Sequence, residues 1–136
     1  MGNEADILNA SRTVAVVGLS AKEDRPSFIV ARYLQEQGYK IVPVNPTLTG
    51  KILGEPVYPD LVSIPHPVDV VDIFRKAEEV MPIVEDAIQI GARAIWMQEG
   101  IVNEGAAGRA RAAGIKVVMD RCMKKEHARL HRGMPR

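Results

Sequence analysis

TVAVVGLSAKEDRPS, residues 13–27, is the stretch that decides the fold. It begins with a run of β-branched and small apolar residues, breaks at Gly18, passes through a polar loop that holds Lys22 and Arg25, and then enters a helix. This order predicts a buried strand, a turn and a helix N-terminus. A helix start presents unpaired backbone N–H groups and the positive end of the helix dipole, so this loop is suited to binding a phosphate.

The same helix, glycine and strand pattern recurs along the chain. Gly38, Gly91 and Gly114 each end an expected helix, and a basic residue and an apolar strand follow each of them. Strands are expected at 13–17, 40–44, 68–74, 94–98 and 115–119, and helices at about 4–10, 27–37, 78–90, 103–113 and 121–130. Such repeats are typical of βαβ units, whose right-handed crossovers produce a parallel sheet.

We therefore expect one domain over residues 1–136, an α/β fold with a Rossmann-like three-layer sandwich. Its five-stranded parallel sheet is predicted in the strand order 3-2-1-4-5, counted along the chain. Ligands bind such sheets beyond the C-terminal ends of the strands, where the order reverses, which is expected between strands one and four. Because Pro43 lacks an N–H donor, the second strand is expected to pair imperfectly or to end early near Asn45 and Pro46.

Composition restricts the class of protein. The 136 residues carry 18 Lys and Arg against 17 Asp and Glu, a balance that provides no overall field for nucleic-acid binding. No apolar run is long enough for a membrane span, and the first residues do not resemble a signal peptide, so we expect no membrane association and a cytoplasmic location. The single cysteine, Cys122, excludes a disulfide within the chain.

The loop after the first strand departs from the dinucleotide fingerprint G-x-G-x-x-G, because Ser20 and Glu23 occupy the second and third glycine positions. Asn45-Pro46 follows the second strand where NAD-binding domains place an acidic residue for the ribose. No P-loop pattern occurs either. A ligand with an additional phosphate, met by Lys22 and Arg25, fits these residues better than NAD does.

Several short motifs point to a known family. They are Gly18-Leu19-Ser20, Arg25-Pro26-Ser27, Gly38-Tyr39, Pro43-Val44-Asn45-Pro46, Trp96-Met97-Gln98-Glu99-Gly100 and Asp120-Arg121-Cys122-Met123. In this order and spacing the chain resembles the small stand-alone CoA-binding proteins, whose fold is similar to that of the CoA-binding domain of the succinyl-CoA synthetase α subunit. The resemblance extends from about Ile7 to His127.

The resemblance implies that coenzyme A lies across the C-terminal edge of the sheet. Backbone donors of the loop and the Ser20 hydroxyl are then expected to hold the phosphates, with Arg25 beside them. The implied contacts are Gly18, Leu19, Ser20, Ala21 and Arg25 for the phosphates, Asn45 and Pro46 for the phosphorylated ribose, and Ile73, Phe74 and Arg75 beside the nucleotide, with adenine against Ile73 and Phe74.

The first hypothesis for function is a non-enzymatic CoA or acyl-CoA binding protein that acts as a carrier, a sensor or a regulatory subunit. The resemblance also implies that the chain lacks the phosphohistidine domain and the ATP-grasp partner of the synthetase. Cys122 and His127 are both expected near the crevice edge, but they are five positions apart on an expected helix and face different sides, so we expect no catalytic residue. His66, between two prolines, and His131 lack the neighbouring ligands that metal binding requires, so we expect no metal site.

Two other functions stay open from the residues alone. One is an NAD(P)-linked oxidoreductase fragment, and the other is an interaction module whose crevice holds no nucleotide. The partner of the chain is likewise open between a second copy, packed through the small-residue helix at 103–113, and a catalytic subunit.

Overall fold

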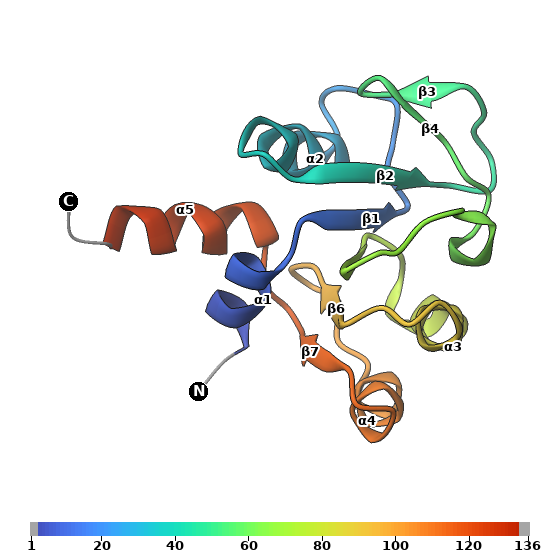
Figure 1. Cartoon of the computed structure of the whole chain (residues 1–136), viewed down its shortest axis with the longest axis vertical. Coiled ribbons are helices and arrows are strands. Elements are labelled where there is room, and N and C mark those ends of the chain that lie inside the picture. Colours follow the sequence, from blue (N-terminus) through green and yellow to red (C-terminus); the bar gives the residue numbers. More distant parts are fainter. Residues whose placement is uncertain (1–2, 134–136) are drawn as a thin grey trace.

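The computed structural model of the chain describes residues 3–133. Helices and strands alternate along most of the chain, as the glycine pattern predicts (Figure 1). The elements are α1 (Glu4–Ala10), β1 (Thr13–Val17), α2 (Pro26–Glu36), β2 (Lys40–Val44), β3 (Lys51–Ile52), β4 (Glu55–Pro56), the 3-10 helix η1 (Leu61–Ser63), β5 (Val70–Ile73), the 3-10 helix η2 (Ala77–Glu79), α3 (Val80–Gln89), β6 (Ala94–Met97), α4 (Glu104–Ala112), β7 (Lys116–Val118) and α5 (Met123–Gly133).

The sheet confirms the predicted fold class, a five-stranded parallel sheet of the Rossmann-like kind. The predicted strand order is wrong. The observed order is β2-β1-β5-β6-β7, so the third long strand, β5, lies beside β1 and not outside β2. In register, Val14 lies opposite Val70 and Val17 lies opposite Ile73. The point at which strand order reverses is therefore between β1 and β5.

The connection from β2 to β5 explains this order. Residues 47–69 contain no crossover helix but the short β3-β4 hairpin and η1. Tyr58, just after the hairpin, pairs with the outer edge of β2: its N–H donates to the Pro43 carbonyl at 3.0 Å, and its carbonyl accepts from the Asn45 N–H at 2.9 Å. Because this edge is occupied, the next long strand joins the sheet on the free side of β1.

Pro43 does not disturb the pairing of β2, contrary to expectation. All five residues of β2, Lys40 to Val44, are in register with β1. The Pro43 carbonyl points outward to Tyr58, so the side of the residue that lacks an N–H also faces away from β1. An edge strand tolerates proline in this orientation because no ladder bond is lost.

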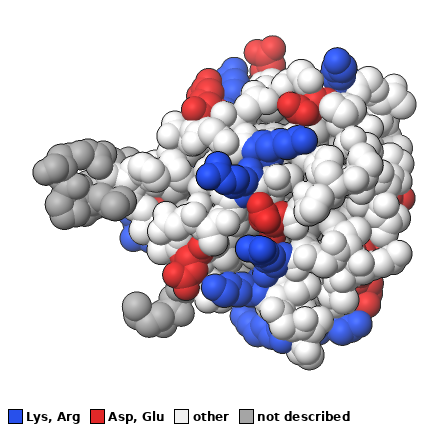
Figure 2. Space-filling view, viewed as in Figure 1, with Lys and Arg blue, Asp and Glu red and all other residues white. Residues whose placement is uncertain are grey.

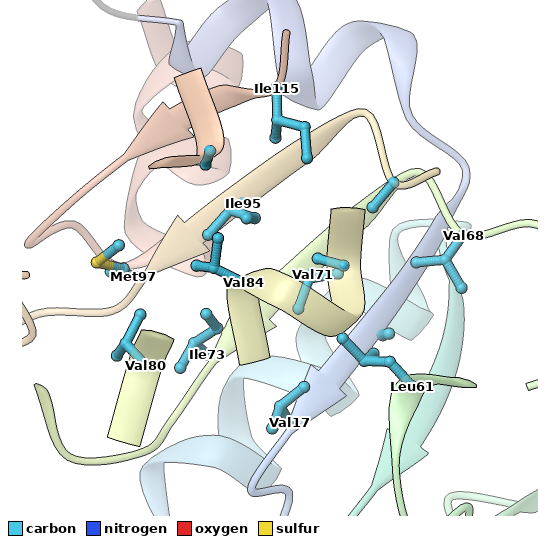
Figure 3. Close-up of a cluster of buried hydrophobic side chains, with 14 of the residues drawn as sticks. Val17, Leu61, Val68, Val71, Ile73, Val80, Val84, Ile95, Met97 and Ile115 are labelled. Carbon is cyan, nitrogen blue, oxygen red and sulfur yellow. The ribbon is translucent and has the colours of Figure 1, made fainter. Parts of the chain in front are cut away.

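Two apolar layers cover the sheet, as expected for strands buried on both faces. Alternate residues of β1 divide between them: Val14 and Val16 pack under α1, α2 and α5, whereas Ala15 and Val17 pack under α3 and α4. Figure 3 shows the second layer, where Val80 and Val84 of α3 lie against the sheet. Over residues 3–133 we find no helix with the length and apolar character that crossing a bilayer requires.

Candidate functional site

Gly18 makes the turn that ends β1, and two observations show why the position requires glycine. Its φ is +90°, a left-handed conformation that side chains disfavour. A Cβ atom built on Gly18 lies 2.6 Å from the Phe74 carbonyl oxygen, so the backbone at the end of β1 lies in close contact with the backbone at the end of β5. The Gly18 N–H donates to the Val44 carbonyl at 2.8 Å, which ties the turn to β2 as well. The turn is thus fixed against both neighbouring strands.

The loop between Gly18 and α2 is held by its two serines. The Ser20 N–H donates to the Ser27 hydroxyl at 3.0 Å, and the Lys22 N–H donates to the Ser20 hydroxyl at 3.0 Å. Ser27 was expected to begin α2, but Arg25 is the N-cap residue and no side chain caps the helix. Pro26 accounts for the earlier start, because its fixed φ suits the first helical position. The first-turn N–H groups of α2 therefore remain available to a ligand.

A cavity of about 350 Å³ lies along this loop. Its lining residues are Gly18, Ser20, Lys22, Arg25, Pro26, Ser27 and Phe74. Among residues 3–133, neither the Lys22 ammonium nor the Arg25 guanidinium forms an ion pair. Lys and Arg are otherwise interspersed with Asp and Glu on the face that Figure 2 presents. The cavity thus combines two cations that form no ion pair within the described residues with an uncapped helix N-terminus, a local arrangement that attracts phosphate.

Two further cavities lie along the C-terminal edge of the sheet, and one of them adjoins the first. The second, of about 440 Å³, shares Pro26 and Phe74 with it and extends to Lys76, Gln98 and Cys122. The third, of about 290 Å³, lies on the α3 side of the sheet and is lined in part by Pro46, at the end of β2, and by Arg75. The Arg75 Nε donates to Glu79 at 2.9 Å, so this cation is already paired.

The sequence-predicted residues meet at this edge, but not all of them present a side chain to a ligand. Ile73 is fully buried under α3 and Leu19 is also fully buried, so both residues offer a ligand only their backbone in this structure. The cause for Ile73 is strand alternation, which directs its side chain away from the layer that holds Phe74. Ala21 is exposed in the loop.

Asn45 connects the loops that follow β1 and β2. Its Nδ2 donates to the Leu19 carbonyl at 3.1 Å, and its Oδ1 accepts from the Thr47 N–H at 2.9 Å and from the Thr47 hydroxyl at 2.7 Å. Both ends of this buried amide thus bind the protein. Its place in the site is to fix the Gly18 loop relative to Pro46.

Replacing the Asn45 amide with a carboxylate is expected to loosen this connection. In Asn45→Asp the oxygen that faces the Leu19 carbonyl has no proton to donate at neutral pH, so the variant should lose about 1–3 kcal/mol of unfolding free energy in urea denaturation. Asn9→Asp, an exposed change on α1, serves as the control and should alter stability by less than about 0.5 kcal/mol. Equal effects at both positions would show that the Asn45 amide does not hold the loops.

With this geometry established, comparison with known proteins identifies the family. Residues 12–128 match the family described as CoA binding domain. The chain belongs to this CoA-binding family. Within the family it is 40% identical over 123 residues to the uncharacterized protein YneT of Bacillus subtilis (strain 168), a match that covers 90% of each chain.

Solved structures and a larger relative agree with the family. A hypothetical protein from Pyrococcus horikoshii OT3 superimposes with a TM-score of 0.91 at 40% identity, covering 95% of this chain and 90% of that chain. The acetate–CoA ligase [ADP-forming] II of Archaeoglobus fulgidus is 34% identical over 100 residues, which are 71% of this chain and 15% of the ligase. The match to this CoA-binding domain thus spans a small fraction of that ligase.

Three residues of this CoA-binding domain, Lys76, Gln98 and Cys122, were not among the predicted contacts, although their loops were placed at the right edge. All three line the second cavity. A signal for them was present, since Lys76 and Gln98 follow buried strands and Cys122 precedes a helix. Their shared cavity, however, depends on the adjacency of β5 and β6, which the predicted order did not contain.

His127 was expected near this edge together with Cys122, but it lies away from it, because α5 runs from Cys122 toward the N-terminal ends of the strands. Its Nδ1 is 2.7 Å from the Tyr33 hydroxyl, and its ring borders a cavity with Arg12 and Gly38 at the opposite edge of the sheet. Burial, and secondarily the neighbouring His131, lower the pKa of His127 below its usual value. No group of three or more His, Cys, Asp or Glu residues suited to a metal ion occurs in the described part of the chain.

Proposed function

We propose that this chain binds CoA or an acyl-CoA across the C-terminal edge of its sheet and acts without catalysis, as a carrier, a sensor or a regulatory subunit. The observation that carries the proposal is the first cavity of a CoA-binding family member: an uncapped α2 N-terminus flanked by Lys22 and Arg25, which have no ion-pair partner in the described residues. CoA carries a diphosphate and a 3′-phosphate, so it supplies the negative charge that this arrangement stabilises.

The two further cavities suggest how the rest of CoA lies. With the diphosphate at the Gly18 loop, the neutral pantetheine arm fits the second cavity, where Pro26, Val30 and Ile101 supply apolar walls. The phosphorylated ribose then lies toward Pro46 but outside the third cavity, because the Asp60, Glu79 and Asp86 carboxylates that line this cavity repel a phosphate. Phe74 lines both the first and the second cavity, so it contacts the ligand where the arm leaves the phosphates.

The separation of the chain's nucleophile and base supports a role without catalysis. Nucleophilic catalysis needs the two groups within hydrogen-bond reach. Cys122 lines the second cavity at the C-terminal edge, whereas His127 borders a cavity at the opposite edge and binds Tyr33. Neither residue therefore assists the other.

A thermal melt with CoA, dephospho-CoA and NAD at equal concentration tests the proposal. A ligand that binds only the folded state at about a hundredfold excess over Kd stabilises by about 2.7 kcal/mol, which raises Tm by several degrees for a domain of this size. CoA is expected to raise Tm most, and dephospho-CoA less because it lacks the 3′-phosphate. A larger shift with NAD, or no shift with any ligand, would overturn the proposal.

A pair of matched arginine variants locates the phosphates. Arg25→Gln removes a cation from the first cavity and should weaken CoA binding about tenfold or more, because a hydrogen bond to a charged group contributes about 1.5–3 kcal/mol. Arg93→Gln removes an exposed cation from the opposite edge and should leave the Kd for CoA unchanged. Equal Kd values for the two variants would show that the phosphates of CoA do not bind at the Gly18 loop.

A further inference from the structure

Cys122 lies at the inner wall of the second cavity. It is a free thiol, 8% exposed, in the residue that immediately precedes α5. The same cavity shares Phe74 and Pro26 with the cavity of the Gly18 loop, so the two form one continuous depression. A molecule held by its phosphates at Gly18 thus has a direct path into the cavity that Cys122 lines.

Gln98 provides a second and independent sign of a ligand in this cavity. The residue is 5% exposed, and its Oε1 accepts from the Met123 N–H at 3.2 Å. Within residues 3–133 its Nε2 has no hydrogen-bond partner, although the side chain lines the cavity. Among the described residues this nitrogen is not one of the buried polar atoms that lack a partner, so it reaches the open space of the cavity. A ligand that brings a carbonyl oxygen into the cavity therefore finds a free amide donor on the cavity wall.

The hydrogen bond from Met123 also places the amide beside the thiol. Met123 directly follows Cys122, so the bond to Gln98 brings the side chain from the end of β6 to the residue next to the cysteine. The Trp96 Nε1 donates to the Arg121 carbonyl at 2.9 Å and fixes the residue on the other side of Cys122. The thiol is thus held in place from both chain neighbours, next to an unpartnered amide donor.

We propose that Cys122 forms a mixed disulfide with CoA, the Gln98 Nε2 donating to an amide carbonyl of the pantetheine arm. This inference rests on the proposed function, because the phosphates must be held at the Gly18 loop for the arm to enter the second cavity. The pantetheine arm ends in a thiol and carries two amides, so it matches the thiol and the amide that the cavity offers.

The reaction is thiol–disulfide exchange with the symmetrical disulfide of CoA. The Cys122 thiolate attacks one sulfur of that disulfide, a new sulfur–sulfur bond forms to CoA, and the second CoA leaves as a thiolate that takes up a proton. No other oxidant or reductant is needed. Reduced CoA binds the same cavity without reaction, so the chain distinguishes the two redox forms by whether the ligand becomes covalently attached.

The test is intact-protein mass spectrometry of the full chain during incubation with CoA disulfide. The expected product is one adduct, heavier by one CoA less two hydrogen atoms and reversed by dithiothreitol. Because Cys122 is the chain's single cysteine, the mass alone locates the adduct. Bis(2-hydroxyethyl) disulfide, which lacks the nucleotide, serves as the reference reagent and is expected to react at least about tenfold more slowly, because binding raises the effective concentration of CoA disulfide.

Three variants test whether the reaction rate depends on how the protein positions CoA disulfide or only on how accessible the Cys122 thiol is. Gln98→Glu keeps an acceptor for the Met123 N–H but removes the amide donor, so it should slow the reaction with CoA disulfide several-fold and leave the reaction with bis(2-hydroxyethyl) disulfide unchanged. Arg25→Gln should slow only the CoA reaction, and Arg93→Gln neither.

The outcomes separate this inference from the proposed function. If CoA raises Tm but both disulfides modify Cys122 at equal rates, CoA binds elsewhere than against the thiol, and the mixed disulfide is overturned while the function stands. If CoA neither raises Tm nor reacts preferentially as its disulfide, the proposed function fails together with the inference. Preferential reaction lost in Gln98→Glu supports the assignment of both side chains.

Discussion

Gly18→Ala is expected to lower the free energy of unfolding by about 2–6 kcal/mol and to abolish CoA binding. Two separate effects add at this position. The φ of +90° strains any residue with a side chain, at about 1–3 kcal/mol. The new Cβ also lies 2.6 Å from the Phe74 carbonyl oxygen, a backbone atom that moves only with β5, and overpacking of this kind typically costs about 1–3 kcal/mol. Urea denaturation and a CoA melt measure the two losses.

Gly50→Ala is the matched control for this prediction. Gly50 has a similar φ of +81°, but no atom lies within 4 Å of its Cβ position. The control therefore carries the backbone strain without the contact and is expected to lose about 1 kcal/mol while CoA binding persists. Equal losses in the two variants would mean that the approach of β1 to Phe74 contributes nothing.

Asp72→Asn is expected to stabilise the protein at neutral pH, because the asparagine side chain cannot ionise in the buried position where a carboxylate charge is disfavoured. Asp72 lies in the middle of β5, opposite Val16 and Trp96, and is completely buried. Within residues 3–133 neither of its carboxylate oxygens has a hydrogen-bond partner. Burial therefore raises the pKa of Asp72 well above its usual value. Asparagine keeps the shape of the side chain and cannot ionise.

The stabilisation by Asp72→Asn is expected to depend on pH, because the wild-type carboxyl titrates and the asparagine does not. The folded state holds the Asp72 proton more tightly than the unfolded state does, so wild-type stability falls as pH rises from the unfolded pKa through the folded pKa. The difference in unfolding free energy between Asp72→Asn and wild type should be small near pH 4, increase with pH, and become constant above the folded pKa. Chemical denaturation from pH 4 to pH 9 measures this curve.

An exposed aspartate provides the control for the charge effect. Asp24→Asn removes the same charge from the Gly18 loop surface and should change stability by less than about 0.5 kcal/mol at every pH. If Asp72→Asn instead destabilises the protein throughout this range, the carboxylate has a favourable partner in solution, such as a buried water molecule, and its burial does not oppose folding.

The sequence was sufficient to predict the five strands of the parallel sheet and the five α-helices, but not the β3-β4 hairpin or the order of the strands. Glycines such as Gly38 and Gly91 end helices through local backbone conformation, and the strands are recognised by continuous apolar runs, both of which depend on nearby residues alone. The place of β5 depends on a nonlocal fact, that Tyr58 occupies the outer edge of β2. Nothing in residues 47–69 taken alone indicates this pairing, so the predicted order was wrong although the fold class was confirmed.

The same distinction applies to the candidate site. The Gly18 loop was predictable because a strand, a glycine and a helix start are adjacent in sequence. The burial of Ile73 follows from which helix layer covers each face of β5, and the proximity of Gln98 and Cys122 follows from a bond between segments 25 residues apart. A sequence pattern within one segment indicates neither the burial of Ile73 nor the proximity of Gln98 to Cys122. The assignment of Asn45 to a loop-connecting role likewise required the position of the Leu19 carbonyl.

Pro43 and Tyr58 together also limit the ways in which the sheets of two copies of this protein can join. Unpaired strand edges are the places where sheets of separate molecules join and aggregate. On the outer edge of β2, Tyr58 already bonds to the Pro43 carbonyl and to the Asn45 N–H. Pro43 also has no N–H that could donate to a strand of another molecule. The opposite edge is β7, only three residues long. Neither edge of the sheet thus provides a long unpaired strand to which a second molecule could add its own sheet. We therefore expect any stable assembly of these chains to form through the helical layers.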